Sequence, residues 1–156
     1  MQNYSPQNHC VVLQNLELLI VSFGGVGTSF FMNFFNQHKL INCRHNGDGL
    51  KHLVEPPLVL SPNLKAIYIF GDPIEATVSL FRRGYHHAHS RKISPDKEAT
   101  LELMSPETSL EDYAGYGKDL FGFERHYQNW SYIDRHYPVL FIYSLQLYLG
   151  LFGGNF

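Results

Sequence analysis

A glycine-rich loop with two hydroxyl side chains is the first group of residues in this chain that could do chemistry. Its residues are Gly24, Gly25, Val26, Gly27, Thr28 and Ser29, and they follow an apolar run. Glycines let the backbone N–H groups of such a turn point inward, and the positive end of a following helix attracts an anion. The loop therefore predicts phosphate or sulfate binding, and the alternative is a tight turn that binds nothing.

The loop lacks the lysine of a nucleotide-hydrolysing P-loop. Such a loop ends in Gly-Lys-Ser or Gly-Lys-Thr, where the lysine reaches the outer phosphates and the hydroxyl holds magnesium. Here Gly27 is followed directly by Thr28. This difference argues against an ATPase or a kinase.

Three apolar runs separated by helical patterns must position the loop. We expect strands at 16–23, 65–70 and 139–143, and helices at 28–38, 73–83 and 121–136. Asp72 as N-cap and Pro73 at the first helical position begin the second helix. Strands that alternate with helices are typical of a parallel sheet. The sequence predicts an α/β fold of three layers, with helices on both faces of the sheet, of the P-loop NTPase type.

The remaining segments are less regular. Four phenylalanines at helical spacing predict that helix 28–38 packs one aromatic face on the sheet; they are Phe30, Phe31, Phe34 and Phe35. Segment 39–63 is expected to be a long connection with at most a short strand at 50–54. We expect a polar lead-in at 1–15, a single domain at 16–147 with a lid-like insertion of short helices at 84–117, and an irregular tail at 148–156.

Composition narrows the class of protein. The chain has 156 residues, a length typical of one domain. Its net charge of −2 gives no excess of basic residues for binding nucleic acid. Cys10 and Cys43 lack metal-ligand spacing and are expected as free thiols or as one disulfide. No apolar run is long enough for a membrane span, and the start lacks a basic signal region. We expect a soluble, cytoplasmic protein.

Four blocks in chain order, within residues 16–143, resemble the sulfotransferase family. Residues 24–30 resemble the family loop Pro-Lys-Ser-Gly-Thr-Thr-Trp, and residues 50–53, Leu-Lys-His-Leu, resemble Lys-Thr-His-Leu-Pro. Residues 65–79 resemble Lys-x-Ile-Tyr-x-x-Arg-Asn-Pro-x-Asp-x-x-x-Ser, and residues 122–130 resemble Gly-x-x-x-x-His-x-x-x-Trp. Gly25 stands at the family's catalytic lysine and Gly71 at an arginine that binds phosphate. The closing Arg-Lys-Gly segment has no counterpart, which predicts an open donor site and self-association.

The resemblance implies transfer of a sulfuryl group from 3′-phosphoadenosine 5′-phosphosulfate to a hydroxyl or amine of a small-molecule, glycan or lipid acceptor. It implies that His52 is the catalytic base, that residues 24–29 hold the phosphosulfate and that Ser79 binds the 3′-phosphate. Three cations are candidates for the missing charge: Lys51, Arg82 and Arg83. The two arginines also lie where cations favour the helix dipole.

Two other functions remain open. The absence of cations at Gly25 and Gly71 favours a catalytically silent binding module, and the glycine loop alone allows a P-loop nucleotide-binding protein. No metal is expected, because adjacent His86 and His87 point apart in a regular element and no carboxylate or cysteine completes a set with His89 or His126. The aromatic residues Phe123, Tyr127 and Trp130 suit either the core or a pocket.

Overall fold

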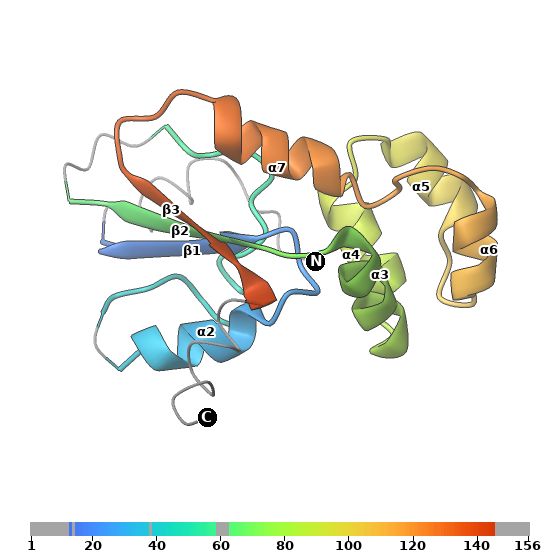
Figure 1. Ribbon diagram of the computed structural model, residues 1–156, viewed down its shortest axis with the longest axis horizontal. Helices are drawn as coiled ribbons and strands as arrows, with labels where there is room; N and C mark the ends of the chain where they lie inside the picture. The colour runs from blue at the N-terminus through green and yellow to red at the C-terminus, as the bar shows by residue number, and fades with distance from the viewer. Residues whose placement is uncertain (1–12, 14, 38, 59–62, 146–156) are drawn as a thin grey trace.

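A three-stranded parallel sheet is the centre of the fold (Figure 1). The computed structural model describes residues 13, 15–37, 39–58 and 63–145. The strands are β1 (Leu18–Ser22), β2 (Lys65–Phe70) and β3 (Val139–Tyr143), in the order β1-β2-β3. In register, Val21 pairs with Tyr68, and Tyr68 pairs with Phe141. The chain is therefore an α/β protein, as the sequence predicts.

Six helices are described around this sheet. They are α2 (Thr28–Phe35), α3 (Pro73–Arg82), α4 (His86–Ile93), α5 (Lys97–Leu103), α6 (Leu110–Gly115) and α7 (Phe123–Tyr132). Figure 1 shows α7 on one side of the sheet and α2 on the other, while α3 to α6 gather beyond the carboxyl ends of β1 and β2. In open α/β sheets ligands bind at that end of the strands.

The face of β2 that carries Tyr68 is packed against α7. The Tyr68 ring stacks on Trp130 with 5.6 Å between ring centroids, and Tyr68 and Trp130 are both fully buried. The Trp130 indole N–H donates to the backbone oxygen of Leu53 at 2.8 Å, which satisfies its polar atom inside the core. Phe123 is also buried. Trp130 therefore belongs to the core rather than to a pocket.

Helix α2 differs from the sequence prediction. Phe31 is buried and Phe35 is packed against the core, but Phe30 and Phe34 are 49% and 59% exposed. Residues one apart point about 100° away from each other around a helix, so two such pairs do not share one face. The predicted single aromatic face of four phenylalanines was wrong, and fully buried Met32 takes its place in the core.

Two further elements are shorter or less buried than predicted. Segment 50–54 forms turns and bends rather than a strand. Helix α7 ends at Tyr132, because Ile133 has extended backbone angles, and does not reach residue 136. Strand β3, an edge strand of the described sheet, is only half-buried, with Leu140 58% exposed.

Segment 84–117 contains the short helices that the sequence predicts. Helix α4 buries His89, Ser90 and Ile93, so this part of the segment contributes to the core. Ser109 and Asp112 form a capping box at the start of α6. The lead-in is described only at residues 13 and 15, and the tail at 148–156 lies outside the described residues. Cys43 is free and exposed, whereas Cys10 lies outside the described residues.

None of the helices in the described part of the chain is both long enough and apolar enough to cross a bilayer.

Candidate anion-binding site

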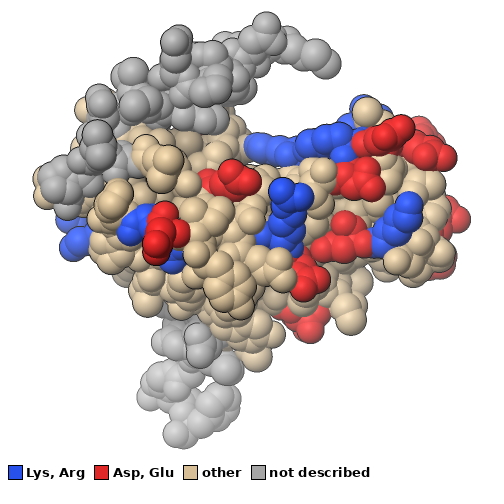
Figure 2. Space-filling view, turned by 90° about the horizontal axis from the view of Figure 1, so that it is seen from above, with Lys and Arg blue, Asp and Glu red and all other residues tan. Residues whose placement is uncertain are grey.

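A cavity of about 560 Å³ lies beyond the carboxyl end of β1, between the glycine loop and helices α3 and α4. Three basic residues line it, Lys51, Arg83 and Lys92, and no aspartate or glutamate of the described residues does. The face of the molecule in Figure 2 is different, because acidic and basic side chains are mixed there. We call this hollow the basic cavity. Its charge suits an anionic ligand.

The glycine loop forms one wall of the basic cavity. Gly24, Gly25 and Gly27 have φ of 96°, 75° and 77°, the left-handed region that favours glycine. The Ser22 hydroxyl at the end of β1 accepts from the Thr28 hydroxyl at 2.6 Å and from the Gly24 N–H at 3.2 Å. Gly27 then caps α2 without a side-chain hydrogen bond. The first N–H groups of α2 therefore have no capping side chain, and Thr28 and Ser29 at this helix start line the cavity.

The two glycines that stand at expected cations are closely packed. A Cβ atom at position 25 would lie 2.6 Å from the Ala76 backbone oxygen and 2.7 Å from the Ala76 Cα, both in α3. A Cβ atom at position 71 would lie 2.5 Å from the Ser144 hydroxyl oxygen. Neither position has room for a longer side chain without movement of its neighbours.

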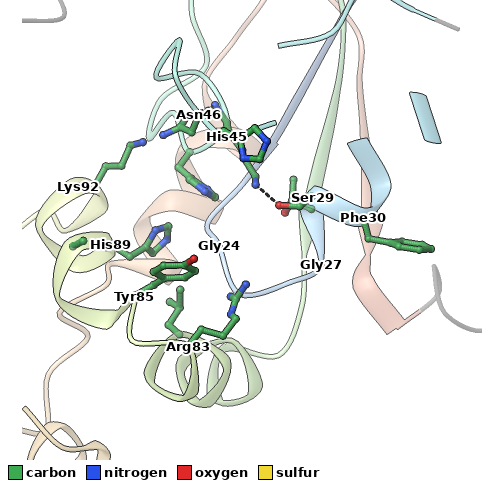
Figure 3. Close-up of a pocket in the computed structure, with 16 residues that line it drawn as sticks. Gly24, Gly27, Ser29, Phe30, His45, Asn46, Arg83, Tyr85, His89 and Lys92 are labelled. Atoms are coloured by element: carbon green, nitrogen blue, oxygen red, sulfur yellow. Dashed lines mark hydrogen bonds between the residues drawn. The ribbon is translucent and has the colours of Figure 1, made fainter. Parts of the chain in front are cut away.

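Lys51 brings a positive charge to the loop from another part of the chain. Its ammonium donates to the Ser29 hydroxyl at 2.6 Å, the dashed line in Figure 3, and to the Arg44 backbone oxygen at 3.0 Å. Burial, and then the charges of Arg83, Arg44 and Lys92, lower its pKa to about 8. An ammonium has three donors, so one is left for a ligand. Among the described residues Lys51 has no carboxylate within ion-pair distance.

Two histidines hold consecutive carbonyl groups where β1 enters the loop. His52 Nδ1 lies 2.9 Å from the Ser22 oxygen, and His89 Nε2 lies 2.6 Å from the Phe23 oxygen. A carbonyl oxygen only accepts, so these nitrogens carry the protons. The lone pairs are then on His52 Nε2 and His89 Nδ1. The two rings meet edge to face with 4.7 Å between centroids.

Both imidazoles are neutral at neutral pH. Burial, followed by the neighbouring His89, lowers the pKa of His52 well below its ordinary value. Burial lowers the pKa of His89 to about 4, although its hydrogen bond to Phe23 opposes the shift. A neutral His52 with a free ring nitrogen can accept a proton from a ligand.

Most of the site residues expected from the sequence line the basic cavity: Gly24, Gly25, Gly27, Thr28, Ser29, Lys51 and His52. Val26 is buried and does not line it. Ser79 and Arg82 in α3 are not among the lining residues either. Instead the next residue, Arg83, lines the cavity, donates to the Ser79 backbone oxygen at 3.0 Å and lies 5.5 Å from the centre of the Tyr85 ring.

Sequence reasoning did not assign four further lining residues to an anion site: His45, Asn46, His89 and Lys92. Figure 3 shows Arg83 and Tyr85 on one side of the cavity and His45 and Asn46 on the opposite side, with the Lys92 side chain extending toward Asn46. His89 and Lys92 are three residues apart and therefore share a face of α4. That helical spacing is the sequence signal that could have found His89 and Lys92.

Within the described residues no group of three or more histidine, cysteine or carboxylate side chains is placed to hold a metal ion. The sequence matches no family model, and neither the curated proteins nor the solved structures contain a match.

Proposed function

We propose that this chain is a sulfotransferase-like domain that transfers a sulfuryl group from 3′-phosphoadenosine 5′-phosphosulfate to a hydroxyl or amine. One observation carries the proposal: Lys51 contacts Ser29 at the start of α2, beside neutral His52, in a cavity with basic but no acidic described side chains. A fold of the P-loop type is part of the proposal, supported by the order β1, glycine loop, α2.

Two kinds of group contribute to the transfer: a base that accepts the proton, and donors that stabilise the leaving group. His52 accepts the acceptor's O–H or N–H proton at Nε2 as the acceptor atom forms its bond to sulfur. The bond from sulfur to the 5′-phosphate oxygen breaks, and the electron pair leaves on adenosine 3′,5′-bisphosphate. Lys51 and the N–H groups of the loop stabilise the negative charge that builds on this oxygen. Lys51 thus takes the role of the catalytic lysine that the family has where this chain has Gly25.

A catalytically silent binding module is the second candidate. The packing of Gly25 against Ala76 favours it, because a cationic side chain at position 25 would not fit without movement of α3. Such a module would bind the nucleotide through the same basic cavity and transfer nothing. Binding and transfer must therefore be measured separately.

The test is calorimetric titration of the full chain with adenosine 3′,5′-bisphosphate, followed by a transfer assay with phenols, amines and sugars as acceptors. We expect binding without magnesium, and transfer that falls about 100-fold in His52→Asn, because a general base contributes about that much. His136→Asn is the matched control, since His136 is exposed and outside the cavity. Binding without transfer identifies the silent module, whereas absence of binding, or binding only of ATP with magnesium, overturns both candidates.

A further inference from the structure

A second cavity, of about 700 Å³, lies on the other side of α3 from the basic cavity. Aromatic rings from several elements line it: Phe23, Phe70, Tyr113, Phe123 and Tyr127. We call it the aromatic cavity. Its volume is within the range of sites that enclose small organic ligands.

Helix α3 and the start of the glycine loop form the wall between the two cavities. Ile74 and Thr77 of α3 line the aromatic cavity, whereas Leu80 of the same helix lines the basic cavity. The Phe23 ring lines the aromatic cavity, while its backbone oxygen accepts from His89 of the basic cavity. His52 lines only the basic cavity, so a ligand behind this wall is not placed for the transfer proposed above.

Three polar groups of the aromatic cavity already have partners. Thr77 donates its hydroxyl proton to the Pro73 oxygen at 2.8 Å. Asp119 accepts from the Gly122 N–H at 2.8 Å, and Glu124 accepts from the side chain of Gln128 at 2.9 Å.

The charged residues that line this cavity are exposed to solvent: Lys118, Asp119 and Glu124. The other lining residues carry no charge, and five of them are aromatic. A planar, uncharged ligand fits this chemistry, because ring stacking and burial of apolar surface need no polar partner.

We propose that the aromatic cavity is a second binding site, which takes an uncharged, planar aromatic small molecule. The proposal is independent of the function proposed for the basic cavity, because the two cavities have different linings and opposite requirements for ligand charge. Phe23 links the two cavities, because it lines the aromatic cavity and its backbone oxygen accepts from His89, which lines the basic cavity.

The test uses N-phenyl-1-naphthylamine, an uncharged aromatic probe whose fluorescence rises in an apolar site. We expect saturable binding of one probe by the full chain, and at least a tenfold loss of affinity in Ile74→Lys, which puts a charge at the cavity. Val78→Lys is the matched control, because Val78 is an exposed residue of the same helix and lines neither cavity. Ala114→Trp, at an exposed lining position, should also reduce binding by filling the space.

Absence of saturable probe fluorescence overturns the proposal, and so does an equal loss of affinity in Ile74→Lys and Val78→Lys. Binding of adenosine 3′,5′-bisphosphate should be the same in Ile74→Lys as in the unchanged chain. That second titration separates a failure of the aromatic cavity from a failure of the basic cavity.

Discussion

Lys51 is a buried cation that an anionic ligand would stabilise. It is 8% exposed, close to other cations, and its pKa falls to about 8. A buried charge without an opposite charge costs stability, and the protein keeps it here beside a loop of backbone donors. An anion in the basic cavity would remove this cost and raise the pKa of Lys51 again.

Replacing Lys51 with methionine should separate binding from stability. We expect Lys51→Met to weaken binding of adenosine 3′,5′-bisphosphate by about 10-fold to 100-fold, because a charge-assisted hydrogen bond is lost. The melting temperature of the ligand-free chain should stay equal or rise, since an uncompensated buried cation is removed. Titration calorimetry and thermal unfolding measure the two effects.

Lys65→Met is the control for this variant, because Lys65 is exposed and lies outside the basic cavity. It should change neither quantity. A Lys51→Met chain that binds the bisphosphate as tightly as the unchanged chain contradicts the role given to Lys51.

At the scale of elements, local signals decided which parts of the fold the sequence could predict. β2 has the predicted bounds, and α3 begins at Pro73 because Asp72 caps it by accepting from two backbone N–H groups. Lys51 and His52 were both predicted from the sequence as site residues, and both line the basic cavity. Their binding and catalytic roles stay predictions.

Contacts between distant segments could not be predicted from local signals. His89 of α4 contacts the loop 66 residues earlier in the chain, and Phe30 is exposed although its helical spacing predicted that it packs on the sheet. The packing of Gly25 on Ala76 likewise joins the glycine loop to α3, and no sequence pattern specifies their relative placement. Composition and periodicity predict elements, whereas the site depends on how those elements dock.

The docking of α3 on the loop gives a test at this scale. Gly25→Ala should lower the free energy of unfolding by about 2 kcal/mol or more, because alanine is strained at this positive φ and its Cβ meets the Ala76 backbone. Urea unfolding measures the change.

Gly115→Ala is the matched control. No atom lies within 4 Å of a Cβ at that position, and Gly115 is in helix α6, where alanine is favoured. It should leave stability unchanged or raise it by about 0.5–1 kcal/mol. If both variants unfold at the same urea concentration, α3 does not pack on the loop as described.

Across the whole molecule, three neutral histidines with lowered pKa values pack near the sheet, of which two are buried and His52 is partly buried. They are His52, His89 and His126, and burial is the main cause that lowers each pKa. His126 lies on α7 and contacts the Tyr68 hydroxyl at 2.9 Å. Protonation of His89 or His126 places a charge inside the core, so stability depends on pH through both.

Stability should therefore be lost as the pH falls below about 6.5. The pKa values of His89 and His126 drop from 6.5 to about 4 in the folded protein, so the unfolded chain binds more protons between these values. The stabilisation is complete above pH 6.5 and disappears as the pH falls through 4, at about 3 kcal/mol for each residue. Thermal unfolding between pH 7.5 and pH 4 at constant ionic strength measures it. His89→Gln keeps a donor for the Phe23 oxygen and should flatten the curve, and an equally steep curve contradicts this assignment.

The capture of two consecutive carbonyl groups by His52 and His89 also determines how relatives of this chain would be recognised. The loop itself is short and glycine-rich, and such turns are common in unrelated proteins. The distinctive pattern is a spaced signature: a histidine 30 residues after the serine that ends β1, and another 66 residues after the phenylalanine that follows it. A chain that keeps both histidines keeps the hydrogen bonds to these two carbonyl groups, even where the glycines themselves differ.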